Sequence, residues 1–134
     1  MSVLGNGLAA ADYHEDALSV KEAELAMKRR LGATVERILV VQVNLASTYE
    51  EIGRQEEALN LYRDVYSGEL ILYGTAHEQT IISASNYAWT LKALRRYDEA
   101  KTLMRKKLPV ARRVLGPAHP VTRGLQGIHA ATQP

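Results

Sequence analysis

The chain has no cysteine, no phenylalanine, only one tryptophan and four prolines among its 134 residues. Without cysteine it can form no disulfide framework and offers no thiol nucleophile. No apolar run approaches the roughly 18 residues that a membrane-spanning helix needs. The N-terminal stretch MSVLGNGLAAADYHED lacks the basic start of a signal peptide. We therefore expect a single domain of a cytoplasmic protein, with no membrane association.

Recognisable catalytic motifs are also missing. We find no glycine-rich phosphate loop, no Gly-x-Ser-x-Gly and no paired carboxylates in a known frame. A zinc site needs three or four converging ligands, whereas two of the four histidines recur at a fixed interval along the chain. The sequence therefore predicts no enzyme: no catalytic residue, no metal ligand and no cofactor.

Charge is divided unevenly along the chain, although the net charge is only +2. Residues 1–91 carry 7 Lys and Arg against 13 Asp and Glu, a net of −6. Residues 92–134 carry 10 against 2, a net of +8. Such a division indicates either a basic binding patch or the two solvated faces of a helical stack, and the composition alone leaves both open.

The clearest feature is an internal repeat. The stretches YGTAHEQT and LGPAHPVT lie 42 residues apart, and residues 44–80 align without gaps on residues 86–122. Twelve of the 37 aligned positions are identical: Asn44/Asn86, Ala46/Ala88, Thr48/Thr90, Arg54/Arg96, Glu57/Glu99, Ala58/Ala100, Leu61/Leu103, Arg63/Arg105, Gly74/Gly116, Ala76/Ala118, His77/His119 and Thr80/Thr122. A fixed period of this size is typical of a helical solenoid. The histidines then mark the junctions between repeats.

Each repeat reads as two helices. Apolar residues at helical spacing predict helices over 34–52 and 55–73, and again over 77–95 and 97–115. Gly53, Gly74 and Gly116 follow predicted helix ends, where glycine is favoured. Thr34 and Thr75 are predicted N-caps. A proline inside the last of these helices predicts a kink near residues 105–109.

The ends of the chain hold partial copies of the repeat. Residues 13–32 resemble a second helix that ends at Gly32, and residues 117–131 predict a short capping helix weakened by Gly124 and Gly127. We expect one repeat domain over 1–134. It would have a partial repeat at about 1–32, full repeats at about 33–74 and 75–116, and a capping half-repeat at about 117–131. The expected fold is all-α: a right-handed superhelix of antiparallel helix pairs, with about six helices.

The stretches NLASTYEEIGRQEEALNLYRDV and NYAWTLKALRRYDEAKTLMRKK resemble tetratricopeptide repeats. That family places small residues where paired helices touch and large apolar residues between them. The matching small residues are Ala46, Ala58, Ala88 and Ala100, and the matching large ones are Tyr49, Tyr62, Leu91 and Met104. The period of 42 and the LG…H…T linker are similar to the kinesin light chain type of this repeat.

The resemblance implies a protein-interaction module. In this family the first helix of each pair lines a concave groove, where an asparagine hydrogen-bonds the backbone of a bound peptide. Asn44 and Asn86 match that position, although an asparagine there can also tie adjacent helices together. With the residues around them, the predicted partner-binding set is Val40, Asn44, Ser47, Glu51, Ile82, Asn86, Trp89, Lys92 and Arg96.

The residues around Asn86 suggest the chemistry of the partner. Trp89 is expected either to face the groove or to pack against the neighbouring repeat. With Lys92 and Arg96 close by, a groove-facing Trp89 predicts an acidic peptide segment with an apolar or aromatic anchor.

Two other classes of function remain as alternatives. The exposed half-repeats could pair with a second copy, which would make the chain a structural or self-assembly element. For the oligomeric state we expect a monomer or a weak homodimer. A nucleic-acid surface could use the basic residues of the C-terminal part, but it lacks interleaved aromatics and a known motif. That set is Lys92, Arg95, Arg96, Arg105, Lys106, Lys107, Arg112 and Arg113.

Overall fold

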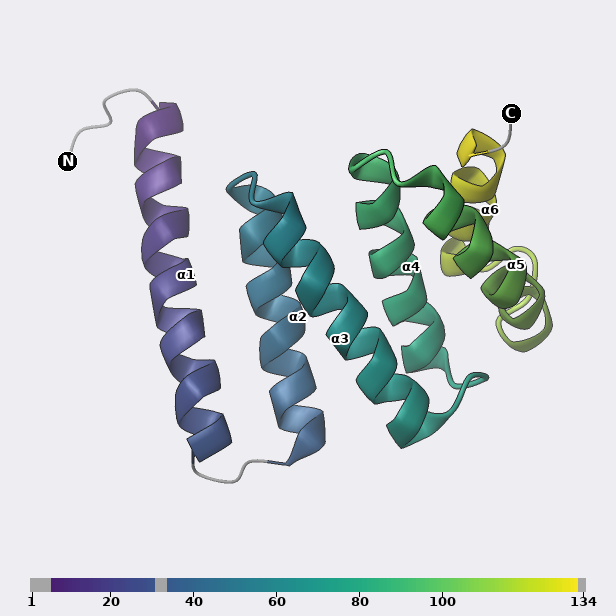
Figure 1. Cartoon of the computed structure of the whole chain (residues 1–134), viewed down its shortest axis with the longest axis horizontal. Helices are drawn as coiled ribbons and strands as arrows, with labels where there is room; N and C mark the ends of the chain where they lie inside the picture. The colour runs from purple at the N-terminus through teal and green to yellow at the C-terminus, as the bar shows by residue number, and fades with distance from the viewer. Residues whose placement is uncertain (1–5, 31–33, 133–134) are drawn as a thin grey trace. The chain divides into compact units, whose positions relative to one another are not determined.

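The computed structural model describes residues 6–30 and 34–132, with side chains from residues 14–27 and 34–132. These residues form six helices and no strand (Figure 1). The helices are α1 (Asn6–Arg30), α2 (Val35–Glu51), α3 (Gln55–Tyr73), α4 (Glu78–Ala93), α5 (Tyr97–Val114) and α6 (Pro120–Thr132). The predicted all-α class and the number of helices are confirmed.

The chain forms two compact units, residues 1–61 and residues 62–134. In the first unit α1 packs along α2. In the second unit α4 packs against both α5 and α6, and α5 also packs against α6. The polypeptide passes from one unit to the other within α3.

The N-terminal helix is longer than predicted. α1 begins at Asn6, whereas the sequence pattern placed its start near residue 13. The added segment contains three consecutive alanines, the residue with the highest helix propensity, so the helix extends through it. The predicted stop at Gly32 lies outside the described residues.

The internal helix breakers do not interrupt their helices. α3 runs through Ser67 and Gly68, and α5 runs through Pro109. α6 likewise runs through Gly124 and Gly127. Packing of an apolar face outweighs the local cost of such residues in a short helix. The kink near Pro109 stays a prediction.

The histidines at the repeat junctions are N-caps. Thr34 caps α2 as predicted, because its hydroxyl accepts from the Arg37 N–H at 3.4 Å. The prediction for Thr75 is wrong, since Nδ1 of His77 caps α4 by accepting from the Gln79 N–H at 3.0 Å. Nδ1 of His119 accepts from the Val121 N–H at 3.1 Å in the same way. Both histidines therefore have a structural role at the start of a helix.

The turns inside the two repeats have the same geometry but different residues. Gly53 has φ +84° and Arg95 has φ +60°, so both take the left-handed conformation. The following N–H in each case bonds back to a carbonyl five residues earlier: Arg54 to Tyr49 at 2.8 Å and Arg96 to Leu91 at 2.9 Å. Only glycine adopts this conformation without steric cost.

The small positions of the repeat are confirmed. Their four alanines are fully buried: Ala46, Ala58, Ala88 and Ala100. The large positions are also buried. Tyr73 and Tyr97, in contrast, are exposed.

Candidate functional site

The predicted site in the second unit lies on α4. Ile82, Asn86 and Trp89 are spaced at i, i+4 and i+7, which places them on one face of the helix. Trp89 is 47% exposed, and the Lys92 ammonium lies 4.8 Å from the centroid of its ring. A Cβ on Gly124 of α6 would lie 3.8 Å from the indole Nε1. The residue therefore lies next to α6 and under Lys92, and about half of it is exposed to solvent.

The side-chain amide of Asn86 is available to a ligand. Residue 86 is partly exposed. Its backbone carbonyl accepts a hydrogen bond from the Thr90 hydroxyl at 3.0 Å. Within the part of the chain that the structure describes, the amide itself forms no hydrogen bond. It can present both a donor and an acceptor, as a peptide bond requires.

The matching face of α2, in the first unit, presents Val40 and Asn44. Val40 is 60% exposed. With Asn44 and four neighbours from α1 and α2, it lines a hollow of about 340 Å³. Ser47 is also exposed. Glu51, at the end of the helix, is exposed and lies 3.8 Å from the imidazole of His14. The structure thus brings Val40 and Asn44 together and pairs Glu51 with α1.

Lys21 of α1 lies beside the predicted site on α2, although the sequence pattern does not connect the two helices. Its ammonium donates to the Thr48 hydroxyl at 2.6 Å and to the Asn44 carbonyl at 3.4 Å. Because α1 packs along α2, Lys21 supports the helix turn that carries Asn44.

Arg96 is already engaged within the chain. Its Nε and Nη2 donate to the Glu99 carboxylate at 2.5 and 2.9 Å. Arg54 makes the same two-pronged contact with Glu57 at 3.0 and 2.8 Å. The arginine hydrogen bonds lower the pKa of both carboxyl groups. The pair is thus a repeated feature of the second helix's start, and it competes with any ligand for Arg96.

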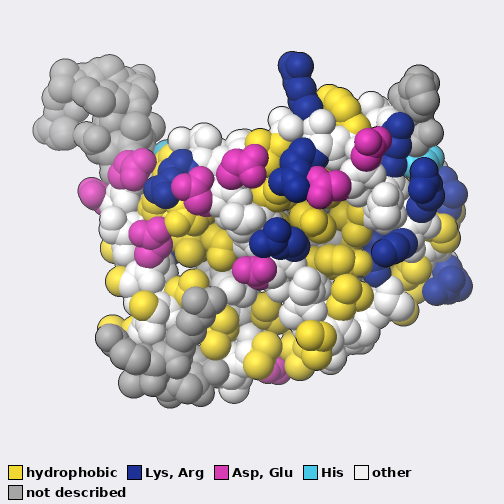
Figure 2. Space-filling model, in the orientation of Figure 1, with side chains coloured by type: hydrophobic (Ala, Val, Ile, Leu, Met, Phe, Trp, Pro, Cys, Tyr) yellow, Lys and Arg dark blue, Asp and Glu magenta, His cyan; other side chains and the backbone are white. Residues whose placement is uncertain are grey.

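Of the eight basic residues in the nucleic-acid alternative, Lys107 is buried and does not contribute to a surface. Lys and Arg side chains do gather over α5 and α6 on the face shown in Figure 2. Lys107, however, is only 3% exposed, donates to the Thr75 hydroxyl at 2.5 Å and lies 5.2 Å from the ring centroid of Tyr66. Burial lowers the pKa of its ammonium. That charge belongs to the interior of the unit.

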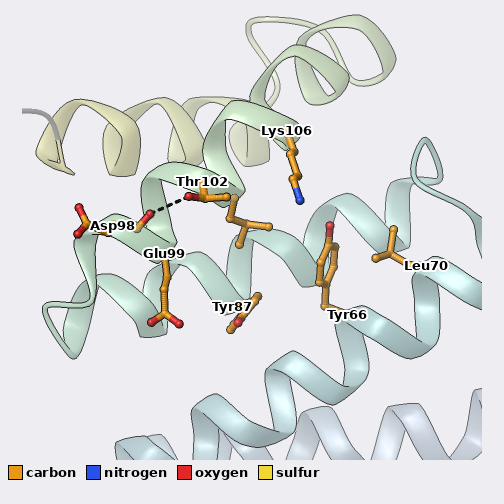
Figure 3. Close-up of a pocket in the computed structure, with 8 residues that line it drawn as sticks. Tyr66, Leu70, Tyr87, Asp98, Glu99, Thr102 and Lys106 are labelled. Atoms are coloured by element: carbon orange, nitrogen blue, oxygen red, sulfur yellow. Dashed lines mark hydrogen bonds between the residues drawn. The ribbon is translucent and has the colours of Figure 1, made fainter.

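A pocket of about 450 Å³ in the second unit was not predicted (Figure 3). Its lining comes from the end of α3, the middle of α4 and the first half of α5, among them Tyr66, Tyr87, Thr102 and Lys106. Tyr66 and Thr102 hold different positions of the repeat. No periodic signal in the sequence therefore brings them together, and the sequence marks Lys106 only as one of several basic residues.

Among residues 6–30 and 34–132, no group of three or more His, Cys, Asp or Glu side chains could hold a metal ion. Within the same residues, no helix combines the length and the apolarity that a bilayer crossing requires.

Comparison with known proteins identifies the repeat. A family model described as tetratricopeptide repeat matches residues 39–77 and 80–121, which together are more than half of the chain. No curated protein matched the chain.

Two solved structures share the fold. The TPR-like repeats of a kinesin light chain from Podospora anserina match with a TM-score of 0.77 and 21% identity, over 89% of this chain and 57% of that one. BtubC (BKLC) from P. vanneervenii matches with a TM-score of 0.74 and 17% identity, over 89% of this chain and 47% of that one. This chain therefore spans about half the length of both. It belongs to the tetratricopeptide repeat family, and its fold is the helical repeat superhelix of the kinesin light chain type.

Proposed function

We propose that the chain is a non-catalytic, cytoplasmic binding module that holds a peptide segment of a partner protein on the exposed face of α4. Tetratricopeptide repeats are generally protein-interaction modules, which gives the class of function. The observation that supports this site is the half-exposed Trp89, with Lys92 over its ring. One turn away lies the Asn86 amide, which has no hydrogen bond to any described residue. A lone tryptophan left open to solvent on a helix face is a typical interface anchor.

The chemistry of this face favours an acidic segment with an apolar or aromatic residue. The indole ring would bury the apolar anchor, and the Asn86 amide would pair with the peptide backbone. Lys92 would attract the acidic residues, mainly through the association rate and over about 8 Å at physiological ionic strength. Val40 and Asn44 of α2 offer similar chemistry in the first unit.

A selected peptide tests the proposal. Peptides chosen from a randomised library should be acidic and contain an apolar anchor. Because Trp89 is the only tryptophan, its fluorescence reports their binding directly. Trp89→Ala should weaken binding by about 2 kcal/mol, and Asn86→Ala by about 1 kcal/mol. Binding to the first variant is followed with a labelled peptide.

Matched controls separate the site from general effects. Tyr97→Ala removes another exposed aromatic, from α5, and Asn60→Ala removes an exposed asparagine from α3. Both should bind like the parent chain. If the selected peptides are basic, or if both site variants bind them unchanged, the proposal fails.

Self-assembly is a second candidate, supported by a different surface. Val20 and Met27 lie seven residues apart on one face of α1 and are 67% and 51% exposed. An apolar stripe of this kind could pair with a second copy. Sedimentation over a range of concentrations would show a concentration-dependent dimer that Val20→Glu abolishes. A monomer at every concentration excludes this candidate.

A further inference from the structure

The pocket of Figure 3 lies on a different side of α4 from Trp89. Tyr87 points into the pocket, and at 3.6 residues per turn its direction differs from that of Trp89 by about 160°. A ligand in the pocket would therefore not use the face proposed above. The two sites can be tested independently.

The walls of the pocket are apolar and aromatic. Tyr66 and Tyr87 lie with their ring centroids 6.0 Å apart and their planes tilted by 33°. Leu70 and Leu103 complete the apolar lining. Burial raises the pKa of both phenols, so they are neutral hydrogen-bond donors at physiological pH. Among the described residues neither hydroxyl has a hydrogen-bond partner. A volume of about 450 Å³ accommodates a leucine or aromatic side chain with room for polar contacts.

The two ends of the pocket carry opposite charge. Lys106 stands at one end, and its ammonium points toward the Tyr66 hydroxyl in Figure 3. The buried Lys107 behind the Tyr66 ring adds a second positive charge there. Asp98 and Glu99 stand at the other end, but Glu99 is paired with Arg96. Among the described residues Asp98 has no ion pair. Its carboxylate points outward from the start of α5, away from Tyr66, in Figure 3, so a basic residue of an extended ligand would meet it just beyond the pocket rim.

The spacing of these charges sets the length of a matching ligand. Asp98 and Lys106 are eight residues apart on α5, which corresponds to about 12 Å along the helix axis. An extended peptide covers that length in three to four residues, at about 3.3–3.6 Å each. Charged residues about four positions apart, with an apolar residue between them, would match both ends and the centre.

We propose that this pocket is a second docking site, for an extended peptide segment that inserts one apolar side chain between Tyr66 and Leu103. The segment carries an acidic residue at the Lys106 end and a basic residue at the Asp98 end. Its pattern is basic-x-apolar-x-acidic, in either chain direction. This partner differs from the acidic segment expected on α4 because the pocket requires both signs of charge.

The test uses labelled peptides with the core Arg-x-Leu-x-Glu, and binding to the full chain is measured by fluorescence anisotropy. Versions with Arg at both ends or Glu at both ends should bind at least about fivefold more weakly, since each places one like-charge contact. Replacing the central Leu by Ser should weaken binding by a similar factor or more. Equal binding of all four peptides overturns the proposal.

Variants of the protein locate the binding. Thr102 is exposed on the pocket rim, so Thr102→Trp should fill the pocket and abolish binding while the melting temperature stays unchanged. Lys106→Glu should switch the preference to the peptide with Arg at both ends. Arg105→Glu makes the same charge change on the adjacent, exposed residue outside the pocket and should keep the original order. If both variants switch the peptide preference, only the overall electrostatic field of the protein acts on the peptide, and the proposed site is wrong.

Two further outcomes separate this proposal from its neighbours. Trp89→Ala should bind the Arg-x-Leu-x-Glu peptide like the parent chain, so that failure of one site leaves the other standing. Sedimentation of the chain without peptide should show no self-association through the pocket. If the chain self-associates and Thr102→Trp abolishes this, a second copy occupies the pocket, and the peptide proposal is wrong.

Discussion

Two helix contacts of the molecule share one backbone arrangement but bury different side chains. They are the contact between α3 and α4 and the contact between α5 and α6. In the first, the Thr80 hydroxyl donates to the Glu69 carbonyl, and in the second, the Thr122 hydroxyl donates to the Ala111 carbonyl, both at 3.3 Å. The glycine that ends the earlier helix has φ +86° in one copy and +94° in the other. The backbone frame is therefore the same.

The side chains inside the frame differ. Glu69, only 8% exposed, accepts a hydrogen bond from Ser83 in the first copy. The matching residues 42 positions later are Ala111 and Leu125, which are fully buried and apolar. Burial raises the pKa of the Glu69 carboxyl group, although the Ser83 hydrogen bond and His77 oppose the rise. The comparison teaches that the repeat conserves its backbone geometry while each copy solves its interior separately.

The largest expected effect comes from placing the buried glutamate of the first copy at the equivalent position of the second copy, without its serine partner. Ala111→Glu should lower the free energy of unfolding by about 3 kcal/mol or more, because it buries a carboxylate without a donor. Adding Leu125→Ser should recover part of the loss, with a coupling of about 1–3 kcal/mol. Urea unfolding measures both. Ala130→Glu, on the exposed side of α6, should change stability by less than about 0.5 kcal/mol. Equal losses of unfolding free energy for Ala111→Glu and Ala130→Glu would mean that the α5–α6 contact tolerates a buried carboxylate.

A smaller effect should follow from enlarging the small residues shared by both repeats. Ala58→Leu and Ala100→Leu should each cost about 1–3 kcal/mol, because both alanines are fully buried where packed helices leave no room. Thermal melting followed by circular dichroism measures the loss. If both variants melt like the parent chain, these positions are not close-packed.

Substitutions at the turns of the two repeats should have smaller effects on stability, and the two effects should be opposite in sign. Arg95→Gly should stabilise the chain by about 1 kcal/mol, because it relieves a left-handed arginine, and Gly53→Arg should destabilise it by about as much. Space is not the cause at Gly53, since a Cβ there would meet nothing within 4 Å. Urea midpoints that move together, rather than apart, would contradict the shared geometry.

The smallest expected effect is a pH dependence that belongs to the first copy only. Because the pKa of Glu69 is raised above its ordinary value of 4.5, the native state holds this proton more tightly than the unfolded chain does. Its contribution to stability is therefore full below pH 4.5 and is lost as the pH rises through the native-state pKa. Glu69→Gln should remove this fall, as shown by urea unfolding at a series of pH values. Parallel pH profiles for the two proteins would rule the effect out.

Much of the fold could be predicted from the sequence because its signals are local and repeated. Four alanines and the glycines at the ends of the second helices recur at 42 residues, and helices α2 to α6 match their predicted bounds to within three residues. The cap of α4 could not be predicted in this way. Thr75 has the better capping propensity, but its hydroxyl is taken by Lys107, which reaches it from 32 residues away.

The features of the candidate sites can be separated in the same way, into those that the sequence predicts and those that depend on tertiary packing. The sequence by itself determined the helix pairs, the buried small positions and the shared face of Asn86 and Trp89, because helical periodicity and the repeat act over a few residues. Only the tertiary structure decided that Lys21 supports Asn44, that Lys107 is buried, and that Tyr66 meets Thr102 and Lys106 around a pocket. These contacts join helices at non-equivalent repeat positions. Side-chain packing between helices, which no local pattern encodes, places them there.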